Sequence, residues 1–241
     1  FPFGTAGKGL VMMSGGIDSP VASYLAMKQG IEIELLHFES TPLTPLESVQ
    51  KVIDLAQKLS VFTGKETIKL HVVPFMDEAL LRHIPDPYII TIMRRMMYRI
   101  AERFAQKEKM LCLINGESVG QVASQTLHSL GVVEAVTQMP ILRPLVTYDK
   151  LDIIKIAKKI DTFDISIRAF NDCCSIYVPK QPVTKPMTIY AEKYESVFDY
   201  ESMVQACVQN IKTLTITPQT DLEIALYGFN FVEALKAFQE E

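Results

Sequence analysis

Two hydrophobic periods alternate along the first two thirds of the chain. The segments 9–14, 31–40, 67–75, 110–116 and 140–146 are continuous apolar runs or alternate every second residue, which predicts strands. The segments 18–30, 45–62, 88–109, 118–130 and 149–160 carry apolar residues every three or four positions, which predicts helices. Strand and helix thus follow one another about five times. This order predicts an α/β fold, a doubly wound parallel sheet with helices on both faces.

The pattern changes after residue 180. A Pro-rich connector, VPKQPVTKP, leads into helical stretches near 188–197, 200–212 and 221–239. We therefore expect one α/β domain over residues 8–180 and a short helical C-terminal extension over 181–241. The opening FPFGTAG has no starting Met, and residues 1–7 are expected to be a linker from an N-terminal region.

Composition narrows the possibilities further. The 241 residues are 48% hydrophobic, enough for a substantial core. The sequence contains no run of about twenty consecutive apolar residues, so it predicts no membrane span. A net charge of −4 argues against a surface that binds nucleic acid all over, so such contacts should be local. Four cysteines without C-x-x-C spacing fit a cytoplasmic location.

The stretch SGGIDS lies where the first strand becomes the first helix. Gly15 and Gly16 allow successive backbone N–H groups to form a concave anion nest beside the positive end of a helix. Ser14 and Ser19 add hydroxyl donors. Asp18 would repel phosphate, and it fits such a loop if it binds Mg²⁺ that the phosphates share. The alternative is a tight turn in which Asp18 caps the helix.

SGGIDS resembles the PP-loop of the ATP pyrophosphatases. Those enzymes cut ATP between the α and β phosphates, adenylate an oxygen of a substrate and replace it with nitrogen or sulfur. Over roughly residues 6–190 the chain is similar to the family of tRNA 4-thiouridine synthetases. The motifs that carry this are HFES (37–40), MRRMMYRIAE (93–102), NGESVGQVASQT (115–126), RPLVTYDKLDIIKIA (143–157) and DISIRAFNDCC (164–174).

The resemblance implies an ATP site. Its residues are Met12, Met13, Ser14, Gly15, Gly16, Asp18, Ser19, His37, Phe38, Arg94, Gly116 and Gln125. His37 and Phe38 would lie beside the adenine, with Phe38 able to stack on it, and the two methionines would form an apolar floor. Without the resemblance, His37 would be interpreted as a core histidine and the methionines as ordinary strand core.

Two features near these motifs have plainer interpretations. Arg95, Arg99, Arg103 and Lys107 recur every four residues, which we interpret as a largely solvated helix face. Glu117 or Ser118 would cap the start of a helix.

The vicinal pair Cys173 and Cys174 is the second chemical centre. Sulfur transfer needs a thiolate that carries or attacks a persulfide. The resemblance makes Cys174 the catalytic cysteine, with Cys173 the other candidate, whereas two buried apolar cysteines are the alternative. Many family members use a second cysteine in a rhodanese domain. Here the expected candidates are Cys173, Cys207 and Cys112, in that order.

The resulting hypothesis is an ATP-dependent tRNA sulfurtransferase that uses Mg²⁺. It would adenylate O4 of a tRNA uridine and replace it with persulfide sulfur from a cysteine desulfurase, giving 4-thiouridine. The resemblance also implies a homodimer, sulfur supply to thiamine thiazole synthesis, and an N-terminal RNA-binding region with a THUMP domain. Lysines that would add phosphate contacts are Lys155, Lys158, Lys159, Lys180 and Lys185.

Two alternatives stay open. One is another PP-loop enzyme, a tRNA 2-thiolase or an amide ligase. The other is a regulator that binds ATP without turnover. The absence of C-x-x-C pairs disfavours a 2-thiolase, and the Cys-Cys pair disfavours a regulator.

Overall fold

The computed structural model describes residues 4–75, 83–120, 125–170, 179 and 181–240. The elements, in chain order, are β1 (Lys8–Met12), α1 (Asp18–Lys28), β2 (Glu32–Glu39), α2 (Leu46–Ser60), β3 (Ile68–Pro74), η1 (Asp86–Tyr88), α4 (Ile89–Lys107), β4 (Cys112–Ile114), α5 (Leu127–Glu134), β5 (Ile141–Leu142), α6 (Lys150–Lys159), α7 (Phe163–Ser166), α9 (Thr188–Glu195), α10 (Tyr200–Gln209), β6 (Lys212–Ile216), η3 (Ile224–Leu226) and α11 (Phe231–Glu240).

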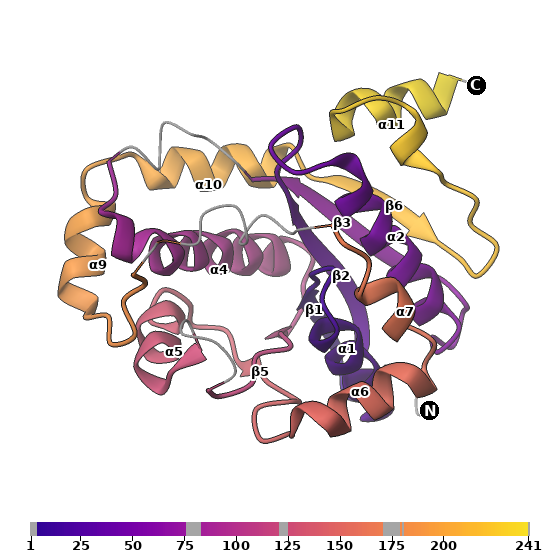
Figure 1. Cartoon of the computed structure of the whole chain (residues 1–241), viewed down its shortest axis with the longest axis horizontal. Coiled ribbons are helices and arrows are strands. Elements are labelled where there is room, and N and C mark those ends of the chain that lie inside the picture. The colour runs from indigo at the N-terminus through magenta and orange to yellow at the C-terminus, as the bar shows by residue number, and fades with distance from the viewer. Residues whose placement is uncertain (1–3, 76–82, 121–124, 171–178, 180, 241) are drawn as a thin grey trace.

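Six strands of the described chain form one sheet in the order β5-β4-β1-β2-β3-β6 (Figure 1). The first five are parallel, and β6 runs antiparallel to β3. Strand order reverses at β1, which pairs with β2 on one side and β4 on the other. In open parallel sheets a crevice forms at the carboxyl ends of the strands where the order reverses, and ligands bind there. The end of β1 is that point in this fold.

Helices cover both faces of the sheet, as predicted (Figure 1). Alternate strand residues point to opposite faces, so Val11 belongs to one core cluster and Leu10 to the other. The cluster with Val11 contains residues from α1, α2, α6 and α11. The cluster with Leu10 contains residues from α4, α5, α9 and α10. The doubly wound α/β prediction is confirmed.

Two local predictions are wrong. The helix expected over 118–130 begins only at Leu127, because Gly120 adopts φ +81° and the Thr126 hydroxyl accepts a hydrogen bond from the Ser129 amide at 3.1 Å, capping the helix there. The C-terminal extension is predicted to be helical, with helices near 188–197, 200–212 and 221–239, but residues 212–216, at the end of the second of these stretches, form the strand β6. Their KTLTI alternation is a strand pattern with only one partly covered face, as befits an edge strand.

The first three arginines of the basic stripe on α4 pair with carboxylates of α9 and α10, whereas Lys107 is exposed. Arg95 is 2% exposed and donates to both carboxylate oxygens of Glu195, at 2.8 and 2.9 Å. Arg99 donates to the same carboxylate, and Arg103 pairs with Glu201. Burial acts to raise the pKa of Glu195, but the two arginines outweigh it and hold that pKa below its usual range. The interpretation as a solvated face is therefore wrong for Arg95.

None of the helices in the described ranges is long and apolar enough to cross a bilayer.

Candidate active site

The loop between β1 and α1 is held by its own two serines. The Ser14 amide donates to the Ser19 hydroxyl at 3.0 Å, and that hydroxyl donates to the Ser14 carbonyl at 2.9 Å. The Gly16 amide donates to the Ser14 hydroxyl at 3.3 Å. Ile17, the N-cap of α1, has no side-chain cap, so the positive end of the helix opens on the loop. The predicted Ser14, Gly16 and Ser19 thus build one compact turn.

Gly116, four residues after the start of β4, packs directly on this turn. A Cβ added there would lie 2.7 Å from the carbonyl carbon of Asp18 and 2.7 Å from the amide nitrogen of Ser19. Real Cβ atoms do not approach backbone so closely, so only glycine fits. The resemblance implied that Gly116 belongs to the ATP site. The close approach found here is to the backbone of residues 14–19, the predicted phosphate loop.

His37 joins β2 to the end of β1. Its ring Nδ1 is 3.0 Å from the Met13 carbonyl oxygen, and the side chain is 3% exposed. Met13 is buried on one face of the sheet, whereas Met12 is partly buried on the other. His37 therefore is a satisfied core histidine and at the same time a neighbour of the predicted nucleotide floor.

The ring of Phe38 is packed in the core, whereas its backbone points toward the β1 side of the sheet. The ring is 6% exposed and lies edge-on to Phe75, with centroids 5.2 Å apart. On the β1 side the register of β2 ends at Met12–Leu36, but on the β3 side it continues to Glu39–Pro74. In a parallel strand, the backbone N–H and C=O groups of successive residues point alternately to the two neighbouring strands. The backbone of Phe38 therefore points to the β1 side, at a level past Met12, where β1 ends. A contact between Phe38 and adenine stays a prediction. With the ring packed on Phe75, we expect the backbone of Phe38 to make that contact.

Asp18 at the start of α1 faces a cation from a distant part of the chain. Lys150 Nζ of α6 lies 2.7 Å from Asp18 Oδ1. The side chains are 44% and 26% exposed, so both remain accessible to a ligand. The sequence interpretation assigned Lys150 no role. Its place at the N-terminus of a helix after the RPLVTY segment was the available signal.

Glu117, just after β4, pairs with two arginines. Arg94 and Arg143 both pair with its carboxylate, Arg143 through Nε at 2.9 Å. Asn115 Nδ2 donates to the same carboxylate at 2.9 Å, and the Tyr98 hydroxyl donates to it at 3.2 Å. All of these groups come from α4, the end of β4 and the segment after β5. The sequence interpretation found Arg94 but missed Arg143 and treated Glu117 as a helix cap.

Gln125, a predicted ATP residue, is one of four described residues with a buried side-chain polar atom that lacks a hydrogen-bond partner. Its side-chain oxygen is buried and has no hydrogen-bond partner in the described structure. Buried polar atoms are nearly always satisfied, so such an atom indicates a missing partner. An amide both donates and accepts, which suits the edge of a base.

The predicted cysteines divide into two groups. Cys173 and Cys174 lie outside the described residues. Cys112 is buried in β4, and burial raises the pKa of its thiol. Burial likewise raises the pKa of Cys207 to about 11, and its thiol donates to the Pro74 carbonyl at 3.4 Å. Because the thiolate is the reactive form, both are poor sulfur carriers.

A metal at this site would depend on Asp18. Among the described residues, no cluster of three or more His, Cys, Asp or Glu side chains could bind one. Mg²⁺ typically takes one or two carboxylates and completes its shell with water and substrate phosphate oxygens. One accessible carboxylate on a phosphate loop fits that pattern.

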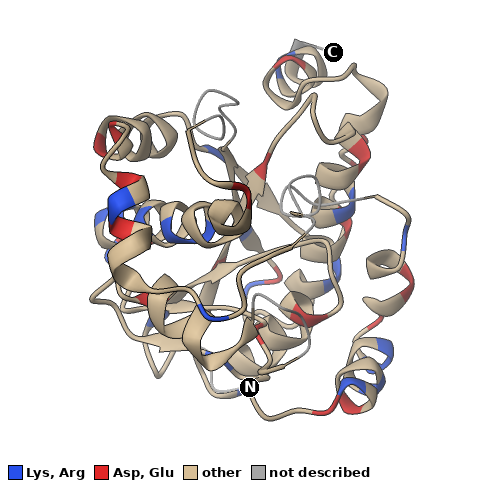
Figure 2. Ribbon diagram, turned by 60° about the vertical axis from the view of Figure 1, so that its left-hand side comes forward, with Lys and Arg blue, Asp and Glu red and all other residues tan. Residues whose placement is uncertain are grey.

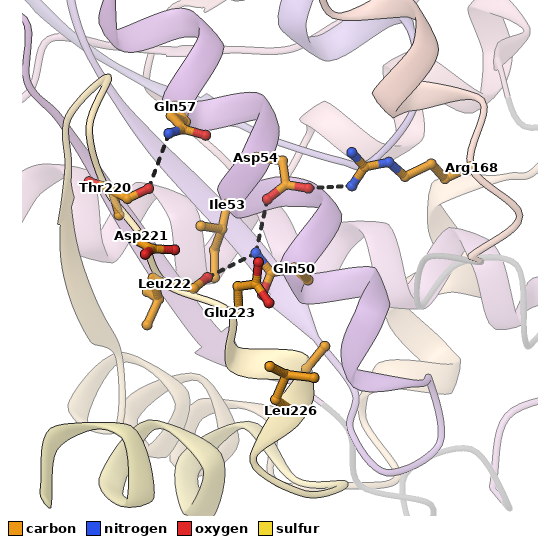
Figure 3. Close-up of a pocket in the computed structure, with 11 residues that line it drawn as sticks. Gln50, Ile53, Asp54, Gln57, Arg168, Thr220, Asp221, Leu222, Glu223 and Leu226 are labelled. Atoms are coloured by element: carbon orange, nitrogen blue, oxygen red, sulfur yellow. Dashed lines mark hydrogen bonds and ion pairs between the residues drawn. The ribbon is translucent and has the colours of Figure 1, made fainter. Parts of the chain in front are cut away.

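A separate cavity of about 450 Å³ lies between α2 and the segment 220–226 (Figure 3). None of the predicted ATP residues lines it.

Comparison with known proteins identifies a family that matches most of the chain. A family model described as "Thiamine biosynthesis protein (ThiI)" matches residues 4–200. A "Probable tRNA sulfurtransferase" from Acholeplasma laidlawii is 62% identical over 243 residues, which cover 100% of this chain and 59% of that protein. One from Listeria welshimeri is 48% identical over 217 residues, covering 89% of this chain and 53% of that protein. The chain thus spans little more than half the length of these curated relatives.

One solved structure has a similar fold. It is described as a 4-thiouridine synthetase–RNA complex with bound ATP, and it is 39% identical with a TM-score of 0.84. The match covers 89% of this chain and 56% of the solved one. The phosphate loop at the switch point, the glycine packed on it and the match over residues 4–200 lead to one conclusion. The chain belongs to the ThiI family.

Proposed function

We propose that this chain carries the adenylating centre of an ATP-dependent tRNA sulfurtransferase that makes 4-thiouridine. One observation carries the proposal. The phosphate loop, Gly116 and two sets of cationic side chains converge at the carboxyl ends of β1 and β4. That arrangement suits a triphosphate, and a relative with the same fold was solved with ATP and RNA.

ATP would bind across the crevice. Its adenine would lie against the backbone of Phe38 and the amide of Gln125, and its phosphates would lie on the loop 14–19. Lys150 and Arg94 would offset phosphate charge, and Asp18 would hold Mg²⁺. When bound, Mg²⁺ supplies charge neutralisation for the phosphates. The O4 atom of a tRNA uridine would attack the α-phosphorus, the bond to the β-phosphate oxygen would break, and pyrophosphate would leave.

Sulfur would then replace the adenylated oxygen. A cysteine desulfurase would load Cys174 as a persulfide. Its terminal sulfur would attack C4 of the uridine, the C4–O bond would break, and AMP would leave. A second thiol, for which Cys173 is our candidate, would attack the inner sulfur. The S–S bond to the substrate sulfur breaks, which leaves 4-thiouridine and an enzyme disulfide that a dithiol reductant must reduce. The raised pKa values of Cys112 and Cys207 support Cys173 as that second thiol.

The RNA contact would be local. Basic and acidic residues are interspersed along the ribbon (Figure 2), and the net charge is −4. We also propose a homodimer, a cytoplasmic location in which thiols stay reduced, and sulfur supply to thiamine thiazole synthesis. The name of the matching family motivates the last of these.

Product analysis of ATP tests the proposal. The protein is incubated with ATP and Mg²⁺, with and without unmodified tRNA. Release of AMP and pyrophosphate that depends on tRNA is expected, together with 4-thiouridine when a desulfurase and cysteine are added. ADP as product would contradict α-phosphate attack. ATP binding with no turnover under any condition would favour the regulator.

A further inference from the structure

Lys51 is a buried cation to which neither the sequence motifs nor the ATP site assigns a role. It lies in the middle of α2 and is 4% exposed. Its ammonium donates to the carbonyl oxygens of Ser166, Arg168 and Phe170, at 3.4, 3.3 and 3.0 Å. Removing an ammonium from water is costly, and an apolar side chain would fill the space at less cost. The cation is therefore better explained by what it holds than by stability alone.

The segment that it holds is tied to the phosphate loop. The Ser166 hydroxyl, at the end of α7, donates to the Gly16 carbonyl at 3.3 Å. The Arg168 side chain forms an ion pair with Asp54, one turn along α2 from Lys51 (Figure 3). Residues 166–170 are thus fastened to α2 by Lys51 and Arg168, and to the phosphate loop by Ser166.

The same segment leads to the cysteines in sequence. Cys174 follows Phe170 by four residues, so an extended chain between them spans at most about 14 Å. The carbonyl of Phe170 accepts the shortest of the three Lys51 hydrogen bonds. The ammonium therefore fixes the point from which the chain departs toward Cys174.

We propose that Lys51 is a positioning residue for the sulfur-transfer half of the reaction. Its ammonium holds the backbone of residues 166–170, and so sets the origin of the cysteine segment relative to the phosphate loop. This inference rests on the proposed function. It predicts that the two half-reactions separate when the ammonium is removed, because the hydrogen bond from Ser166 to Gly16 is the contact that joins the held segment to the loop proposed to bind ATP.

The test measures both half-reactions on the same samples of the full chain. In Lys51→Met, the rate of 4-thiouridine formation should fall about tenfold to hundredfold, as expected for a misplaced reacting group. The tRNA-dependent release of AMP should stay within about twofold of wild type, because the substitution leaves the residues proposed to bind ATP in place. Lys51→Arg keeps a cation and should recover most of the thiouridine rate. The matched control is Lys58→Met on the same helix, whose exposed side chain pairs with Asp161, and it should match wild type in both assays.

A chemical readout does not depend on turnover. Alkylation of each cysteine by iodoacetamide is followed by mass spectrometry in the absence of ATP and tRNA. Lys51→Met should change the rates at Cys173 and Cys174 while the rates at Cys112 and Cys207 stay unchanged. A general loosening of the fold would raise all four.

Three results would overturn the role. These are equal losses of AMP and thiouridine in Lys51→Met, unchanged thiouridine formation, and unchanged alkylation at residues 173 and 174. If Lys51→Met does not fold, Lys51→Gln carries the same test, since it keeps a polar side chain without the charge. A wild-type protein that releases no AMP with tRNA would instead contradict the proposed function, and it is recognised before any variant is compared.

Discussion

Lys150 Nζ lies 2.7 Å from Asp18 Oδ1, although 132 residues separate the two along the chain. Exposed pairs of this kind contribute at most about 1 kcal/mol to stability. A carboxylate on a phosphate loop repels phosphate, and an ammonium beside it restores the attraction. We therefore expect the pair to matter for ATP far more than for folding.

Lys150→Met should lower tRNA-dependent AMP release about tenfold to a thousandfold, because a cation aimed at the phosphates is lost. The unfolding temperature should hardly change. Asp18→Ala should likewise remove Mg²⁺-dependent AMP release. Lys28→Met, at the exposed far end of α1, is the control and should behave as wild type. Unchanged AMP release in Lys150→Met would contradict the role assigned to this lysine.

Gly116→Ala should disrupt the phosphate loop, since its Cβ would lie 2.7 Å from the backbone at Asp18 and Ser19. We expect a loss of about 1–3 kcal/mol in the free energy of unfolding and weaker ATP binding. Denaturant unfolding and calorimetric ATP titration measure the two effects. Gly131→Ala is the matched control, because an added Cβ there meets nothing within 4 Å, and in a helix it should be neutral or stabilising. Similar behaviour of the two variants would contradict the packing argument.

Glu117→Ala should destabilise the protein by about 3–5 kcal/mol, because it leaves Arg94 and Arg143 without the carboxylate that both contact in a largely buried site. Glu134→Ala removes the other carboxylate of Arg143 but is 43% exposed, so its cost should stay below about 1 kcal/mol. Urea unfolding of both variants distinguishes them. Equal costs would show that the Glu117 cluster is not a structural hub.

Glu34 should make the fold sensitive to acid. Burial acts to raise its pKa, but hydrogen bonds and charge from His71 and Lys8 outweigh that effect and lower the pKa to about 2. Lys69 also pairs with this carboxylate. The folded pKa lies below the ordinary value, so its stabilising contribution is present above about pH 4.5 and is lost as the pH falls toward 2.

Denaturant unfolding between pH 6 and pH 3 measures this effect. Glu34→Gln should flatten the acid decline. Glu32→Gln on the same strand leaves the cluster of Glu34, His71, Lys8 and Lys69 intact and should keep the wild-type decline. A wild-type decline in Glu34→Gln would assign the acid sensitivity elsewhere.

Cys174→Ala should abolish 4-thiouridine formation and leave ATP binding intact, because the thiolate acts only after adenylation. Nucleoside mass spectrometry and ATP titration measure the two. Cys207→Ala should keep full activity, since its thiol has a pKa of about 11 and donates to a backbone carbonyl. Surviving thiolation in Cys174→Ala would mean that another cysteine carries the sulfur.

Local pattern determined the framework of this protein. Apolar periods of two and of three to four residues predicted the strand–helix alternation, and the parallel sheet followed from it. The glycine turn between β1 and α1 was visible because its chemistry is contiguous: two glycines, two serines and an aspartate in six residues. The start of α5, set by the N-cap Thr126 after the left-handed Gly120, was predicted less well.

Only the tertiary structure decided which residues meet. Periodicity says that Arg95 and Arg99 share a helix face, but not that Glu195 lies opposite them. It places Gly116 after a strand, but not against the backbone of Asp18. The pairing of β6 with β3, the ion pair of Lys150 with Asp18 and the hold of Lys51 on residues 166–170 all join segments far apart in sequence. The sequence determines each element through local backbone and side-chain preferences, whereas the partner of each charge is set by the packing of the whole chain.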